Sequence, residues 1–190
     1  MMWLPSKRGQ VDTIRRLAAW IPLLLVTVAC RAEPARPEAV DPWADATLSD
    51  SGFGPVVVGM TPMEAKAASG DRLRLPERLG AECDYAVAPG IDGLMFMIEH
   101  ARVVRVEVRA RGVRTAEGAG VGDTEARVQE LYPGRVTVSP HKYTDGHYLT
   151  VAPRDAAGGS VQLIFETDGH VVTQFRGGLL PQVAYVEGCG

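Results

Sequence analysis

The sequence predicts an α+β protein of two tandem units, each with one helix packed on a short antiparallel sheet of three to four strands. Apolar and polar residues alternate in several short runs, which is typical of half-buried antiparallel strands. A helix-start signal followed by such runs occurs twice, over 52–112 and 113–190. The Val-Ala-Pro at 87–89 recurs at 151–153, which indicates an internal repeat.

The first unit opens with a helix. Thr61 is a preferred N-cap, Pro62 suits the first helical position, and Glu64 completes a capping box. The helix is expected to end at Ser69, before Gly70. Strands are then expected over 83–89, 94–99 and 103–109.

The second unit repeats this order. Asp123 or Thr124 caps a helix with an apolar face of Val128, Leu131 and Tyr132, and a Pro-Gly pair follows. Hairpin-type Asp-Gly pairs separate the later runs. Strands are expected over 135–139, 148–153, 161–166 and 170–176, with a last strand over 183–187.

Residues 1–29 have the architecture of a lipoprotein signal peptide, in which a basic start leads to an uncharged run from Leu17 to Ala29. The run is too short to span a bilayer, which needs about 20 residues. Cys30, at its end, is expected to be lipidated. Thr27 stands where such signals usually carry Leu, Val or Ile, so an ordinary secretory cut before Cys30 is the alternative.

From these features we expect a protein of the cell envelope, lipid-anchored in the outer membrane and facing the periplasm. Residues 30–51 are rich in Pro and Ala and lack a helical or strand period, which predicts a flexible tether. Trp43 lies in this range, and its ring is expected on the domain or at the bilayer interface. The formal net charge of −3 and the lack of a nucleic-acid motif speak against nucleic acid as a partner.

Two cysteines remain after Cys30. In an oxidising compartment Cys83 and Cys189 are expected to form a disulfide, with a metal site or a reactive thiol as alternatives. No nucleophile elbow, His-Glu-x-x-His motif or phosphate loop is present. We therefore expect no enzymatic activity, no catalytic residues, no cofactor and no bound metal.

The best candidate for a binding site is the segment 141–148. An aromatic hairpin tip that docks on the domain or on a partner is the preferred interpretation, and a metal- or small-ligand-binding sensor is the alternative. Its candidate residues are His141, Lys142, Tyr143, Asp145, His147 and Tyr148.

A second candidate is a basic strand face formed by Arg102, Arg105 and Arg109. It would bind an anionic partner such as a lipid headgroup or an acidic protein surface. The other interpretation is an ordinary solvated strand face, because Glu107 is interleaved with these arginines.

The Gly-Met-Thr-x-x-Glu-Ala opening at 59–65, followed by a helix and a sheet, resembles a known small repeat. SmpA/OmlA-type outer-membrane assembly lipoproteins and beta-lactamase inhibitory proteins carry it. The stretch from Val113 to Tyr148 is similar to a family of uncharacterised bacterial lipoproteins. The resemblance implies an envelope location and the repeat fold, and it carries over no binding residue. We therefore expect a lipid-anchored, non-catalytic envelope module that binds a protein partner, of the assembly or inhibitor type.

Overall fold

The computed structural model describes residues 41–77, 82–154 and 160–189. The expected signal peptide, the lipidated Cys30 and the first part of the expected tether lie outside the described residues. The described residues belong to one compact unit.

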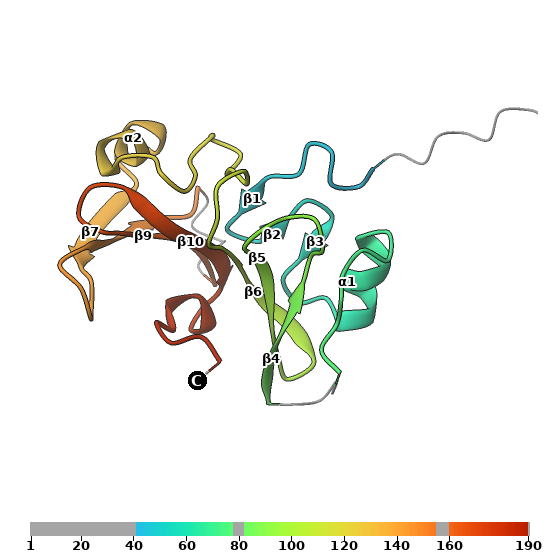
Figure 1. The fold of residues 1–190 in the computed structure, drawn as a ribbon. Helices are drawn as coiled ribbons and strands as arrows, with labels where there is room; N and C mark the ends of the chain where they lie inside the picture. The colour runs from blue at the N-terminus through green and yellow to red at the C-terminus, as the bar shows by residue number, and fades with distance from the viewer. Residues whose placement is uncertain (1–40, 78–81, 155–159, 190) are drawn as a thin grey trace, which may run out of the picture. The chain divides into compact units, whose positions relative to one another are not determined.

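The main element of this unit is a seven-stranded antiparallel sheet, shown in Figure 1. Its strand order is β4-β5-β6-β10-β9-β8-β7. The strands are β4 (Cys83–Val87), β5 (Leu94–Glu99), β6 (Arg102–Val108), β7 (Val136–Pro140), β8 (His147–Val151), β9 (Val161–Thr167) and β10 (Val172–Leu179). Most lie within two residues of the expected strands, so the alternation located the strands well.

The expected fold class, two helix-on-sheet repeats, is wrong. The strands of the two expected units join into one sheet, because β6 pairs with β10, with Val106 opposite Gly177 and Glu107 opposite Arg176. One apolar core therefore spans both halves and contains Phe96 of β5 as well as Phe165 of β9. A second, three-stranded sheet that the sequence did not indicate is formed by β1 (Leu48–Ser49), β2 (Gly52–Phe53) and β3 (Val56–Val57).

The two expected helices are present and capped as predicted. α1 (Pro62–Ala68) begins after Thr61, and the Thr61 and Glu64 side chains form the full capping box. α2 (Glu125–Leu131) begins after Thr124, whose side chain accepts a hydrogen bond from the backbone of Arg127. The two capping predictions were correct because a cap depends only on residues within one helical turn.

The fold begins earlier than the expected boundary at residue 52. Trp43 is 8% exposed. Its ring centroid lies 5.1 Å from that of Phe53, and its indole N–H donates to the Ser69 carbonyl at 3.2 Å. Residues 41–51, which were expected within the tether, therefore pack on the core.

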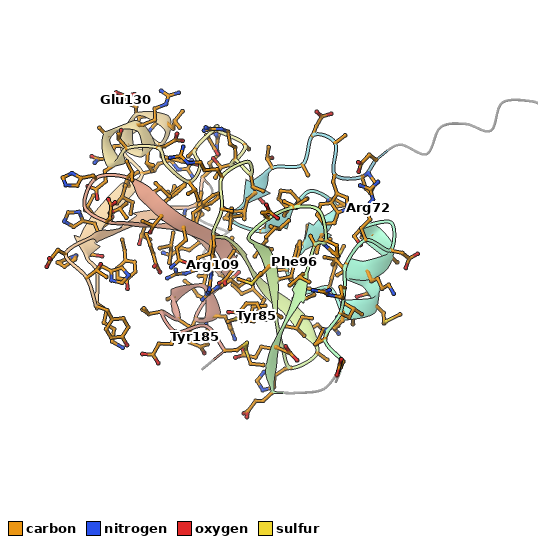
Figure 2. The ribbon with its side chains drawn as sticks, viewed as in Figure 1. Arg72, Tyr85, Phe96, Arg109, Glu130 and Tyr185 are labelled. Carbon is orange, nitrogen blue, oxygen red and sulfur yellow. A yellow bond between two sulfur atoms is a disulfide. The ribbon has the colours of Figure 1, made fainter. Side chains whose placement is uncertain are left out.

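The last residues differ from the expected strand over 183–187. They form a short 3₁₀ helix, η2 (Gln182–Ala184), within a stretch that we call the C-terminal segment, residues 180–189. The carbonyl groups of Tyr185 and Val183 in this segment accept hydrogen bonds from the side chains of Arg105 and Arg176, respectively. In Figure 2, Phe96 lies between the sheet and α1, and Tyr185 lies with the C-terminal segment.

The predicted disulfide between Cys83 and Cys189 is confirmed. It joins β4, at one edge of the sheet, to the end of the C-terminal segment. The segment is thus held at both ends, since its other end continues directly from β10.

Candidate binding surface

The expected binding segment lies at one edge of the large sheet. β7 and β8 form a hairpin with Val138 opposite Leu149 and Pro140 opposite His147. We call β7, β8 and the connecting residues 141–146 the β7–β8 hairpin. A Cβ at Gly146 would lie 1.9 Å from the Thr167 carbonyl oxygen, so glycine allows the hairpin loop to approach β9 this closely.

His141 points inward and is not available at the surface. Its side chain is 10% exposed, and its Nε2 lies 3.3 Å from a carboxylate oxygen of Glu166. The ring stacks on Tyr148 with centroids 4.5 Å apart. Glu166 also pairs with the buried guanidinium of Arg176 and accepts a hydrogen bond from Gln174.

Glu166 stays ionised in this setting. Burial acts to raise the pKa of its carboxyl group, but the charge and hydrogen bonds of Arg176, with those of Gln174 and His141, outweigh burial. The pKa of Glu166 is therefore lowered, and His141 contacts a carboxylate.

His147 faces a different carboxylate. Its Nδ1 lies 2.8 Å from Glu125 at the start of α2, which also accepts a hydrogen bond from Thr167. Burial acts to raise the pKa of Glu125, but the hydrogen bonds from Thr167 and His147 outweigh it and lower the pKa. The two histidines do not converge, and in residues 41–77, 82–154 and 160–189 no group of three His, Cys, Asp or Glu could hold a metal ion.

The tip of the β7–β8 hairpin contacts the C-terminal segment. The Tyr143 hydroxyl donates to Glu187, and the Lys142 ammonium lies 3.7 Å from the same carboxylate. Tyr143 and Asp145 are both exposed, and Tyr143 is 57% accessible. The tip of the hairpin thus docks on its own domain through two polar contacts with Glu187, and most of the Tyr143 ring stays in solvent.

A groove runs beside this contact. It has a volume of about 180 Å³ and lies between the sheet surface of β7 to β10 and the C-terminal segment. Ser139, Tyr148, Thr150 and Gln162 line one side, and Val186 lines the other. Sequence reasoning missed the groove, because its two walls are far apart along the chain.

The outer edge of β7 carries unpaired backbone groups. In an antiparallel pair, alternate residues bond to the partner strand and the others point away from it. Ala152 donates to the Arg135 carbonyl, and His141 donates to the Gly146 carbonyl, so residues 135, 137, 139 and 141 face β8. The backbone groups of Val136, Val138 and Pro140 therefore point away from β8. Among the described residues, β7 has no strand partner on that side.

The opposite edge of the sheet is better protected. Arg74 and Val87 exchange two backbone hydrogen bonds, of 2.9 and 3.0 Å, along the outer side of β4. The disulfide at Cys83 adds a covalent link at the other end of that strand. Of the two edges, β7 is therefore the one open for strand pairing.

The expected basic face is not an exposed patch. Arg105 is 2% exposed and donates to Glu107 at 2.9 Å and to the Tyr185 carbonyl at 2.7 Å. Arg109 is half exposed and lies 2.7 Å from the other Glu107 oxygen. Arg102 is exposed beside Glu64, at 3.9 Å. The C-terminal segment covers the middle of this face, which the alternating charges did not reveal.

No family model matches the chain, and neither curated proteins nor solved structures give a match. Within the described residues, no helix is long and apolar enough to cross a membrane.

Proposed function

We propose that the protein is a lipid-anchored, non-catalytic envelope protein that binds a partner protein through the outer edge of β7. An extended segment of the partner would add to the sheet as a further strand. The observation that carries this proposal is the outward-facing backbone at Val136 and Val138, beside a side chain that is 44% exposed at Val138. Such unpaired edges are templates for strand addition.

The edge favours a partner segment over a second copy of the chain. If two copies paired antiparallel about Val138, each Val136 would face a Pro140 of the other copy. Pro140 has no N–H to donate, so one hydrogen bond would be lost at each end of the pair. A partner segment that has no proline opposite Val136 can form a hydrogen bond with every outward N–H and carbonyl group of β7.

The groove beside β8 supports the same mode of binding. Strand addition gains affinity from main-chain hydrogen bonds and specificity from pockets for alternate side chains. Ser139 of β7 and Tyr148 of β8 line the groove, so it begins next to the open edge. The exposed Tyr143 ring at the hairpin tip offers a further apolar contact.

The proposal is tested by crosslinked capture from intact envelopes with three forms of the chain. The unsubstituted chain and Val138→Thr, which keeps the outward N–H, should recover the same partner. Val138→Pro removes only an N–H that points away from β8, so it should keep the folded sheet and lose that partner. Recovery of the partner with Val138→Pro, or a self-associated dimer in place of a partner, would contradict the proposal.

The sensor interpretation of the 141–148 segment has less support. The Nε2 of His141 and the Nδ1 of His147 already face Glu166 and Glu125, on opposite sides of the hairpin. A metal would have to displace both contacts and bring the two rings together. We therefore do not propose a metal site there.

A further inference from the structure

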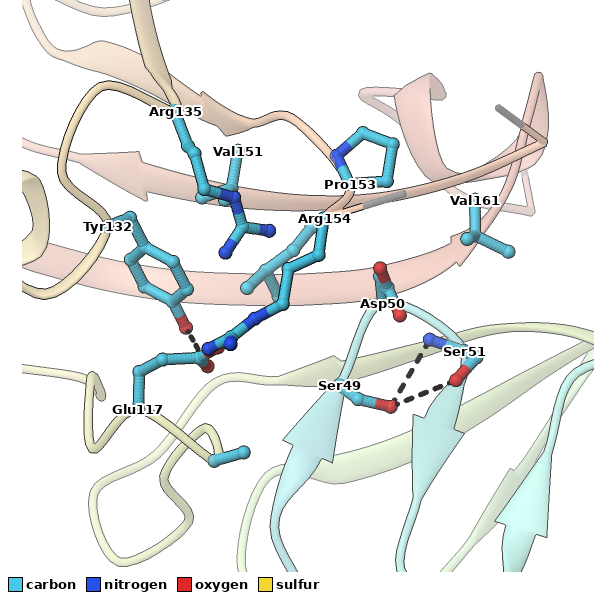
Figure 3. Close-up of a pocket in the computed structure, with 12 residues that line it drawn as sticks. Ser49, Asp50, Ser51, Glu117, Tyr132, Arg135, Val151, Pro153, Arg154 and Val161 are labelled. Carbon is cyan, nitrogen blue, oxygen red and sulfur yellow. Dashed lines mark hydrogen bonds and ion pairs between the residues drawn. The ribbon is translucent and has the colours of Figure 1, made fainter. Parts of the chain in front are cut away.

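A larger cleft lies where several segments that are far apart in the chain meet (Figure 3). Its volume is about 430 Å³. The segments are the turn between β1 and β2, residues 116–117, the residues that follow α2, and the facing ends of β8 and β9. Clefts of this size hold small molecules, and a few polar groups usually set their specificity.

One wall of the cleft is apolar and rigid. Val151 and Leu163, on neighbouring strands, and the ring of Tyr132 are all buried in the shared core beneath it. The Tyr132 ring centroid lies 5.9 Å from that of Phe165. The cleft therefore has an apolar wall that is continuous with the core.

Arg135 supplies a fixed positive charge at this wall. Its Nε and one terminal nitrogen donate to the Ala152 carbonyl at 2.9 and 2.6 Å, and its guanidinium lies 5.6 Å from the Tyr132 ring centroid. A guanidinium has five N–H donors, so donors remain for a ligand. Among the residues that the structure describes, no carboxylate pairs with Arg135.

The negative charge of Glu117, at the floor of the cleft, already has hydrogen-bond partners within the protein. It accepts hydrogen bonds from Tyr132 at 2.9 Å and from Arg154 at 2.8 Å. Burial acts to raise the pKa of Glu117, but these hydrogen bonds outweigh it and lower the pKa. The carboxylate is therefore ionised and occupied, which leaves the Arg135 charge to a ligand.

Asp50 supplies a negative charge from the other side. It lies at the turn between β1 and β2, where the Ser51 backbone donates to the Ser49 hydroxyl at 3.3 Å. A Cβ at Gly177 would lie 2.0 Å from the Ser49 carbonyl oxygen, so this turn packs directly on β10. In Figure 3, Asp50 and Arg135 point into the cleft from opposite sides. No ion pair joins them.

A positive group, a separate negative group and an apolar wall complement a zwitterion with an apolar side chain. We propose that this cleft binds a free α-amino acid with an apolar side chain. Its carboxylate binds Arg135, its ammonium group binds Asp50, and its side chain packs on Val151 and Leu163. This site uses side chains and none of the outward backbone groups of β7.

Calorimetric titration of the full exported chain with leucine tests the assignment. The matched probes are 4-methylpentanoate, which lacks the amino group, and 3-methylbutylamine, which lacks the carboxylate. Leucine should bind at least about tenfold more tightly than either probe, because each probe loses one charge-assisted contact. Valine, methionine and phenylalanine extend the test to other apolar side chains.

Two variants separate the two charged contacts. Asp50→Asn should weaken the binding of leucine at least about tenfold and should not weaken the binding of 4-methylpentanoate. Arg135→Gln should weaken the binding of leucine and of 4-methylpentanoate but not that of 3-methylbutylamine. Arg127→Gln, on the exposed side of α2, is the matched control and should bind leucine as the unsubstituted chain does. The site is overturned if none of the four amino acids binds up to about 10 mM. It is also overturned if Asp50→Asn and Arg135→Gln bind leucine with unchanged affinity, or if 4-methylpentanoate binds as tightly as leucine.

Discussion

Val138 of β7 and Leu149 of β8 stand directly opposite each other in the sheet, yet their burial differs completely. Leu149 is 0% exposed, whereas Val138 is 44% exposed. At this position the apolar core therefore ends between the two strands, whereas Val136 at the start of β7 still packs against its margin. An edge strand in this position gains little from packing on the core, and a further strand on its outer side would cover it.

The ion pair between Arg176 and Glu166 should be important for stability. Both side chains are nearly fully buried, and the C-terminal segment covers them. Arg176→Met leaves the Glu166 carboxylate buried without its main partner, which should lower the free energy of unfolding by about 3–5 kcal/mol. Arg127→Met, at an exposed pair on α2, should change it by less than about 0.5 kcal/mol. Urea unfolding of the three chains measures this, and equal effects would contradict the burial argument.

The same carboxyl group predicts how stability depends on pH. The folded-state pKa of Glu166 lies below its ordinary value of 4.5. Its contribution is therefore present in full above that value and is lost as the pH falls through the lower, folded-state pKa. The stability difference between the unsubstituted chain and Glu166→Gln should shrink as the pH falls from 7 to about 3. A difference that is constant across this range would show that Glu166 is not ionised in the fold.

The disulfide should stabilise the fold through the length of the loop that it closes. Cys83 and Cys189 are 106 residues apart, and the chain-entropy model assigns a loop of this size about 4–5 kcal/mol. Unfolding with and without a reductant measures the difference. A chain with both residues replaced by Ala should match the reduced chain, and a loss below about 1 kcal/mol would contradict the model.

The proposed lipid anchor predicts a change of location. Cys30→Ser should release the protein from membranes into the soluble fraction, because no acyl chain can then be attached. The folded part of the chain should be unaffected, since the described residues belong to one compact unit that does not include Cys30. Fractionation of cells that express each form measures this. Unchanged membrane retention of Cys30→Ser would rule out the anchor.

Local features of the fold could be predicted from the sequence, and non-local ones could not. The capping box at Thr61 and Glu64 depends on residues one turn apart, and it was located correctly. The pairing of β6 with β10 was missed, because alternation shows which residues share a face but not which strands become neighbours. The β1–β3 sheet was missed because each strand has only two residues, too few to show a period.

The candidate sites likewise divide into local ones, which the sequence indicates, and non-local ones, which it does not. Arg105 has the spacing of a solvent-facing strand residue, and only carbonyl groups more than seventy positions later in the chain explain its burial. The hairpin at 141–148 was found because its residues are contiguous. The cleft at Asp50 and Arg135 gave no signal, since each lining segment contributes only a few residues of ordinary type.

Amide hydrogen exchange of the captured complex tests the proposed function most directly and needs no substitution. The outward N–H groups of Val136 and Val138 should exchange freely in the isolated protein. In the complex with a partner, their exchange should slow by at least about tenfold, as expected for amides that enter a sheet ladder. Unchanged exchange at both residues in a stable complex would show that the partner binds elsewhere, and it would contradict strand addition at β7.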